Sequence, residues 1–273
     1  MPGPRPHVLH EATYRQLLEH RPNVAVLPWG ATEAHGWHLP HGTDVMEATA
    51  IAEGAVERAV ATGGRVILLP AIPFGNNAQQ QDQVATIHFS TTTALAILRD
   101  VTESLVRQGI DRLVILNGHG GNAFAPLVRD VMLETGATIV VVNFWQLCPE
   151  VLRATFHDPG DHAGELETSL VLHLHGELVE MERAGDGRTV PFAIEGISQP
   201  GVWTPRPWSQ THPDTGCGNP RQATKEKGKA FFDAACDAVA TMLVAFSQAR
   251  KGQAPYVSHA AGCDDPRPPK TSA

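Results

Sequence analysis

The sequence predicts an α/β fold, a single three-layer α/β/α domain with a mostly parallel sheet. Short apolar runs rich in β-branched residues alternate with segments of helical periodicity, which is typical of βαβ units. The 273 residues suffice for one large domain, and no internal repeat or long linker divides them. With 42% hydrophobic and 18% charged residues, the composition excludes a disordered chain.

The first βαβ unit follows from two apolar runs that flank a helical segment. Residues 23–29 (NVAVLPW) predict a buried strand that ends in a turn. Residues 44–62 predict a helix, with Asp44 as its N-cap and two glycines as its end. Residues 65–69 (RVILL) predict the second strand, which a proline ends.

The next elements repeat this alternation. Apolar residues near 3.6-residue spacing predict a helix over 91–108, which begins at a Ser90 or Thr91 cap and ends at a glycine. Further strands are predicted at 112–116 and 138–144, on either side of a helix at 123–135.

Two helices and one irregular segment complete the domain. Residues 164–175 and 224–249 predict helices, the second long and amphipathic. Residues 183–214 are rich in Pro and Gly and lack periodicity, so we expect an excursion from the domain that forms a pocket wall or an oligomer contact. The domain is expected to cover 1–261, with 262–273 as a disordered tail.

Charge and cysteine content exclude several classes of protein. The net charge of −8 disfavours nucleic-acid binding, because phosphate affinity needs a basic surface. The first 20 residues lack the apolar region of a signal peptide, and no apolar run is long enough to span a bilayer, so no membrane partner is expected. The four cysteines form no CxxC pair, which favours a reducing compartment and a cytoplasmic location: Cys148, Cys217, Cys236 and Cys263.

A first polar cluster follows the first strand. Glu33 and His35 are two residues apart, so in an extended segment their side chains point the same way. Asp44 begins the next helix and is able to turn back towards them. Two carboxylates and an imidazole suit Zn²⁺, Mn²⁺ or Fe²⁺ better than Ca²⁺. The plainer alternative is a solvated loop with unrelated histidines.

A second cluster, Asn-Gly-His-Gly-Gly-Asn at 117–122, follows the third strand. Its glycines allow the backbone to approach a ligand or metal, and His119 is expected at the carboxyl end of the sheet. Anion binding at the next helix and a tight βα turn without function are the alternatives. The dinucleotide-binding glycine pattern and the Walker lysine are both missing.

A third cluster, at 161–169, opens a predicted helix. It contains His162, which we expect at a pocket rim, and Glu165 and Glu167, which cannot share one helix face. Acidic residues are common in the first helical turn, so an ordinary helix start is the plainer interpretation. Trp203 and Trp208, in the irregular segment, are candidates either for a pocket lining or for packing.

Together these motifs resemble the creatininase (creatinine amidohydrolase) family. The resemblance rests on four motifs in register, which span about residues 10 to 250. They are GATEAHG with HLP and GTD at 30–44, NGHGGN at 117–122, HAGELETS at 162–169, and GCGNP with AT and EKG at 216–228.

The resemblance implies a creatininase-like α/β domain with two divalent metal ions per subunit, usually in a homohexamer. Members hydrolyse non-peptide C–N bonds, chiefly of cyclic amides and formamides, whereas one branch trims a peptide in the maturation of a redox cofactor. Carried over, Glu33 and His119 would hold one metal ion, and His35 the other. Asp44 would bridge the two ions, and His162 would be the acid/base residue.

Two departures from creatininase itself bear on the site. Creatininase has a glutamate metal ligand where this chain has Gly121, and Glu167 is our candidate for the missing carboxylate. The Tyr–Glu pair and the Trp–Asp pair of creatininase are replaced by Gly120–Gly121 and by Asp158–Pro159. The residues that would sandwich creatinine are therefore missing, and a different small amide is expected as the substrate.

The sequence thus predicts a metal-dependent amidohydrolase in which a metal-activated water attacks a small amide. Gly120, Gly121 and Asn122 are the expected substrate contacts. The first alternative is a dinuclear metallopeptidase that acts on a short peptide. The second is a non-catalytic small-molecule or nucleotide-binding domain, in which the turn at 117–122 holds an anion.

Overall fold

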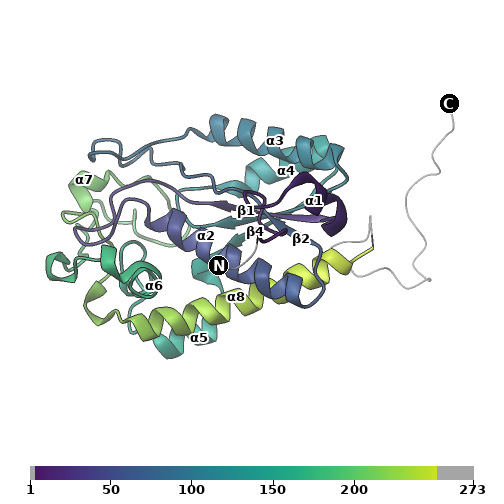
Figure 1. Ribbon diagram of the computed structural model, residues 1–273. Coiled ribbons are helices and arrows are strands. Elements are labelled where there is room, and N and C mark those ends of the chain that lie inside the picture. Colours follow the sequence, from purple (N-terminus) through teal and green to yellow (C-terminus); the bar gives the residue numbers. More distant parts are fainter. Residues whose placement is uncertain (1–3, 251–273) are drawn as a thin grey trace, which may run out of the picture.

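The computed structural model describes residues 4–250, in which a four-stranded sheet is enclosed by helices (Figure 1). The strands are β1 (Val24–Trp29), β2 (Val66–Leu68), β3 (Arg112–Asn117) and β4 (Thr138–Asn143). The helices are α1 (Tyr14–His20), α2 (Thr43–Ala61), α3 (Thr91–Arg107), α4 (Phe124–Thr135), α5 (Pro149–Thr155), α6 (Glu165–His175), α7 (Trp208–Thr211) and α8 (Lys225–Gln248). The predicted single α/β domain is confirmed, whereas the predicted tail at 262–273 lies outside the described residues.

The strand order determines where a site can form. The sheet runs β2-β1-β3-β4, and every neighbouring pair is parallel. The chain leaves β1 for β2 on one side and then crosses to β3 on the other side, so the direction of winding reverses between β1 and β3. Open α/β sheets bind ligands beyond the carboxyl ends of the strands at such a switch point. The segments that follow β1 and β3 meet there.

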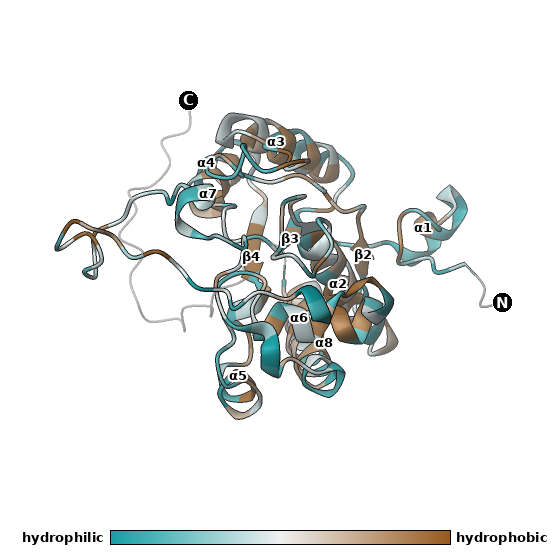
Figure 2. Ribbon diagram, turned by 90° about the vertical axis from the view of Figure 1, so that its left-hand side faces the viewer, coloured by the Kyte–Doolittle hydropathy of each residue, from teal (hydrophilic) through white to brown (hydrophobic). Residues whose placement is uncertain are grey.

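Hydrophobic cores cover both faces of the sheet. One core joins the sheet to α2, α6 and α8 and includes Ile51, Leu170 and Phe231. The other joins it to α3 and α4 and includes Leu98 and Phe124. Figure 2 shows the hydrophobic strands between these helical layers. Every side chain of β1 and β3 is buried, as expected for central strands of a three-layer domain.

Each of the nine predicted strands and helices agrees with the structure to within one residue at either end. The Ser90 hydroxyl accepts the Thr93 N–H at 3.1 Å and so caps α3. The N-cap predicted for α2 was wrong, because Gly42 occupies that position without a side-chain cap. Asp44 lies in the first turn instead, and its carboxylate faces His35 and His119 rather than the helix end.

Helix α8 contains an 18-residue stretch that is long and apolar enough, by length and composition, to cross a membrane. Its apolar side packs along α2 and α6 within the domain. Phe231, Val239 and Leu243 are almost fully buried there. The apolar character of α8 is therefore explained by its burial in the core of the domain, and contact with a bilayer is not needed to explain it.

The segment at 183–214 is largely irregular, as predicted, and contains the short helix α7. Figure 2 shows the loop before α7 extending away from the domain. Ile194 is 67% and Trp203 is 83% exposed, whereas Trp208 is only 3% exposed. One end of the excursion is therefore packed against the domain, and its outer part presents apolar side chains at the surface.

Candidate metal centre and active site

All six residues predicted as metal ligands or as the acid/base residue lie together beyond the carboxyl ends of β1 and β3. Five of them are at most 7% exposed, and the sixth, Glu167, is half-buried. The six are Glu33, His35, Asp44, His119, His162 and Glu167. Three polar segments that are remote in the sequence therefore form one cluster.

Three overlapping sets of side chains offer ligand atoms within 4.8 Å of one another. One consists of Glu33, His35 and His162, and the other two share Asp44. Glu33, Asp44 and His119 form one set. His35, Asp44 and Glu167 form the other. Oδ1 of Asp44 lies 2.7 Å from Nε2 of His35, and Oδ2 lies 3.1 Å from Nδ1 of His119. One carboxylate thus faces both sets, as a bridge between two cations requires.

The turn after β3 brings His119 to Asp44. A Cβ at Gly118 would lie 2.4 Å from the backbone oxygen of Asp44, so only glycine allows β3 to approach α2 this closely. The side-chain oxygen of Asn117 then accepts the His119 N–H at 3.1 Å. The local sequence Asn-Gly-His therefore fixes where the imidazole points.

The charges of the cluster fit a bound divalent metal. Glu33 is fully buried, and its Oε2 has no hydrogen-bond partner among the described residues. Burial lowers the pKa of His35, but the charge of Asp44 and its hydrogen bond outweigh burial and raise that pKa to about 10. Burial also lowers the pKa of His119, but the charges and hydrogen bonds of Glu33 and Asp44 outweigh burial and raise that pKa well above its ordinary value. Without metal, protons on the imidazoles balance the carboxylates, and divalent cations would replace those protons.

The structure explains why position 121 carries no carboxylate. A Cβ on Gly121 would lie 2.4 Å from both the Asn76 oxygen and Nε2 of His119. Glu167 instead approaches His35 and Asp44 from the start of α6, and its carboxylate accepts the Ala163 N–H. Burial raises the pKa of Glu167 to about 7; the charge of Asp44 adds to this rise, and His35 opposes it.

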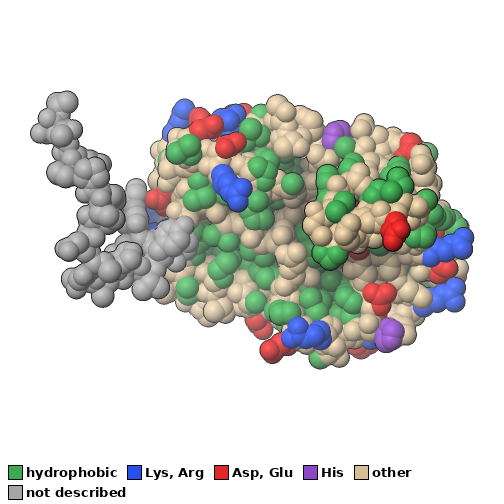
Figure 3. Space-filling model, turned by 180° about the vertical axis from the view of Figure 1, so that it is seen from behind, with side chains coloured by type: hydrophobic (Ala, Val, Ile, Leu, Met, Phe, Trp, Pro, Cys, Tyr) green, Lys and Arg blue, Asp and Glu red, His purple; other side chains and the backbone are tan. Residues whose placement is uncertain are grey.

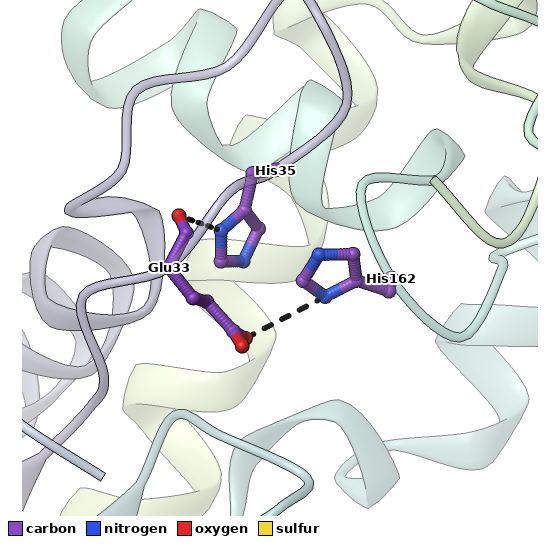
Figure 4. Close-up of side chains that lie close together, drawn as sticks. All are labelled: Glu33, His35 and His162. Carbon is purple, nitrogen blue, oxygen red and sulfur yellow. Dashed lines mark hydrogen bonds and ion pairs between the residues drawn. The ribbon is translucent and has the colours of Figure 1, made fainter. Parts of the chain in front are cut away.

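His162 lies beside His35, with ring centroids 4.1 Å apart (Figure 4). Its Nε2 is 2.8 Å from the Ala34 oxygen, and because a carbonyl only accepts, this nitrogen carries the proton. Nδ1 is left unprotonated, 3.7 Å from Oε1 of Glu33. Burial and the neighbouring charge of His35 lower the pKa of His162 to about 4. His162 is only 7% exposed and packs against His35.

The residues predicted to contact substrate occupy different surroundings. A Cβ on Gly120 would meet nothing within 4 Å, so this backbone borders open space. The Asn122 side chain is engaged in the loop itself, since it donates to the Gly30 oxygen at 3.3 Å and accepts the Asn76 N–H at 3.1 Å. Asn122 therefore ties the turns after β1, β2 and β3 together.

Sequence reasoning overlooked Glu47, which lies one helical turn after Asp44. It is fully buried, and neither carboxylate oxygen has a hydrogen-bond partner among the described residues. Burial, with the nearby charges of Glu167 and Asp44, raises its pKa well above the ordinary value. The spacing of three residues on one helix face was the signal that could have identified it.

Comparisons with known proteins agree with this geometry. The family model described as creatinine amidohydrolase matches residues 10–243. A mycofactocin precursor peptide peptidase of Mycobacterium ulcerans is 32% identical over 238 residues, which cover 82% of this chain and 85% of the relative. Creatinine amidohydrolase of Pseudomonas putida is 27% identical, with coverage of 80% and 87%.

Solved structures have the same fold. A crystal structure assigned as a creatinine amidohydrolase of Bacteroides fragilis superposes with a TM-score of 0.83 at 37% identity, covering 92% of this chain and 99% of that one. Creatininase in a manganese form has a TM-score of 0.75 at 23% identity, and the match covers 89% of this chain and 99% of that one. A mutant creatininase in a zinc–zinc form also has a TM-score of 0.75, at 22% identity, with coverage of 89% and 98%. The chain therefore belongs to the creatininase family of metal-dependent amidohydrolases.

Proposed function

We propose that this enzyme hydrolyses a non-peptide C–N bond of a small amide at a dinuclear metal centre. The observation that carries the proposal is the position of Asp44, whose two oxygens face two different ligand sets. A site for one metal ion would not require a carboxylate that faces two ligand sets. A solvated polar loop would leave its side chains exposed, whereas five of these six are buried.

The two proposed ions would be held by Glu33, Asp44 and His119 in one set and by His35, Asp44 and Glu167 in the other. Bound there, they would supply a water of lowered pKa and polarise the amide carbonyl. Mixed imidazole and carboxylate ligands suit zinc or manganese, the metals of the creatininase forms that share this fold.

His162 is the proposed proton carrier. Nε2–H remains bonded to the Ala34 oxygen, which holds the ring in place. Nδ1 is free to take a proton from the attacking water and to pass it to the departing nitrogen. The backbone N–H groups of Gly120 and Gly121 are proposed to orient the substrate, and the burial of the cluster excludes bulk water.

A small amide fits this site better than a peptide. The mycobacterial relatives are named as peptidases, so peptide cleavage is the second candidate. A peptide needs an open groove on both sides of the scissile bond. Here Glu33, His35 and Asp44 are at most 1% exposed, and Trp208 covers His162. These contacts support a compact substrate.

We further propose a cytoplasmic homo-oligomer, a hexamer in keeping with the family resemblance. The excursion before α7 exposes Val190, Ile194 and Trp203, which suit contact with another copy. On the face shown in Figure 3, Lys and Arg are scattered rather than gathered into a basic patch. Light scattering on the purified chain measures the mass of the assembly and so tests the hexamer.

The test of the reaction is an activity screen coupled to metal analysis. Purified protein, stripped by a chelator and reloaded with zinc or manganese, is assayed against cyclic amides, formamides, linear amides, ureas and short peptides. About two ions per chain with turnover of a small amide is the expected result. Metal binding with cleavage of peptides alone would favour the peptidase, and neither metal binding nor turnover would favour a binding domain.

A further inference from the structure

Trp208 is a buried residue in a largely exposed segment. The excursion at 183–214 leaves Val202 49% and Trp203 83% exposed, whereas Trp208 is 3% exposed. Its indole ring meets His162 edge to face, with centroids 4.7 Å apart and planes inclined by 69°. His162 in turn lies 4.1 Å from His35. Three rings thus connect the excursion to the candidate metal centre.

The surrounding contacts hold this ring in place. The ring of His212 stacks on it at 3.9 Å, and the Arg206 guanidinium lies 5.2 Å from its centroid. Arg206 pairs with Asp161, the neighbour of His162, at 2.8 Å. The backbone N–H of Trp208 donates to the backbone oxygen of Gln79 at 3.2 Å. Contacts from three segments fix the indole over His162, as expected of a positioned functional side chain.

The indole nitrogen itself has no partner. Nε1 of Trp208 is buried and makes no hydrogen bond to any described residue. An indole N–H is a donor only, and in buried positions it usually finds an acceptor. Because the ring lies on the proposed acid/base residue, an acceptor on a bound substrate would satisfy this donor.

We propose that Trp208 is a substrate-binding residue whose indole N–H donates a hydrogen bond to an oxygen of the amide substrate. The inference rests on the proposed function and deepens it, because it implies a substrate with an acceptor oxygen that reaches the His162 side of the site. The ring face would also limit the size of the substrate, which accords with a compact amide.

Trp208→Phe tests the proposal, because it keeps a ring over His162 and removes the donor. The matched control is Tyr14→Phe, which likewise keeps a ring and removes a donor, at a position on α1 that is 77% exposed. With the best amide from the screen, Trp208→Phe is expected to raise KM about 2- to 10-fold, the effect of one lost hydrogen bond, and to change kcat less. The control should match the wild type, and both variants should retain their metal content and melting temperature.

A second variant provides a separate test in case Trp208→Phe does not fold. Arg206→Ala removes the tether to Asp161 from a half-exposed position and should also raise KM, because the indole is then less firmly held. An unchanged KM in folded Trp208→Phe would overturn the proposal. A fall in kcat alone would also overturn it, since Trp208 would then act only through His162.

A binding measurement separates this proposal from the proposed function. Acetohydroxamate, which carries a carbonyl and a second oxygen, is titrated calorimetrically into metal-loaded wild type, Trp208→Phe and Tyr14→Phe. A 2- to 10-fold weaker affinity in Trp208→Phe alone supports the donor role, even if the wild type hydrolyses no amide in the screen. Equal affinities, or no binding by any of the three proteins, would overturn it.

Discussion

Oδ1 of Asp44 lies 2.7 Å from Nε2 of His35, and both side chains are buried where the chain leaves β1 and enters α2. The other oxygen of the same carboxylate faces His119 from the turn after β3. Asp44 thereby connects two segments that are more than 70 residues apart in the sequence. The loss of this one carboxylate should disturb both candidate metal sites together.

Asp44→Asn is expected to lower the content of both metals and to reduce turnover by more than the roughly 10- to 100-fold that outer-shell changes cause. The reason is that an amide offers one neutral oxygen where a bridge needs two charged ones. Metal analysis by mass spectrometry beside the rate is the measurement, with Asp130→Asn on the exposed face of α4 as the control. Retention of two ions per chain would contradict the bridging role.

Glu167→Gln is expected to lose one metal ion and keep the other. Glu167 belongs to the set with His35 and Asp44, whereas Glu33, Asp44 and His119 form a complete set without it. Metal titration of the stripped variant measures the stoichiometry, and Glu177→Gln at a 74%-exposed position is the control. If the variant still binds both ions with wild-type affinity, Glu167 is not a ligand.

His162→Ala is expected to keep both ions and to lose about 10²- to 10⁴-fold in rate, the usual effect of removing a positioned proton carrier. Metal content and rate are measured together, with His175→Ala, at a 41%-exposed position, as the control. Glu33, His35 and His162 also offer ligand atoms within 4.8 Å of one another. A variant that lost metal along with its rate would therefore identify His162 as a ligand.

Creatinine is expected to be a poor substrate. Gly120 and Gly121 provide no side chain to contact its ring, and Asp158 is exposed. A pocket contact as small as one methylene changes kcat/KM about 10- to 200-fold, and the loss here is expected to be at least that large. The measurement compares kcat/KM for creatinine with that for the best amide from the screen, and creatinine ranking first would refute the expectation.

Glu165→Gln is expected to lower the free energy of unfolding by about 1–3 kcal/mol at neutral pH. Burial alone raises the pKa of Glu165, but hydrogen bonds from the Asp158 and His157 N–H groups and the ion pair with Lys227 outweigh burial and lower it. A carboxylate whose pKa is lowered by folding stabilises the protein above its unfolded pKa, about 4.3, and loses that effect as the pH falls through the folded pKa.

Urea unfolding at several pH values tests this expectation. The difference between wild type and Glu165→Gln should be full at neutral pH and should shrink once the pH falls below about 4. Glu177→Gln should match the wild type throughout. A difference that did not depend on pH would show that the charge of Glu165 has no part in the stabilisation.

Periodicity and local motifs sufficed to predict the domain. Nine strands and helices were predicted to within one residue, because buried strands and amphipathic helices each require a characteristic spacing of apolar residues in the sequence. The short helices α1, α5 and α7 were missed, since a single turn or two carries little periodicity. Glu33, His35 and His119 could also be predicted as site residues, because they follow predicted strands whose carboxyl ends meet at one edge of the sheet.

Only the tertiary structure decided how the distant groups combine. Which set Glu167 joins depends on how the start of α6 meets α2, and no local pattern encodes that contact. Position 121 has no room for a side chain because the Asn76 oxygen, 45 residues away in the sequence, packs against Gly121. The Trp208–His162 contact brings an aperiodic excursion back onto the site. Such long-range contacts arise from packing between elements, whereas the sequence records chiefly which face of each element is buried.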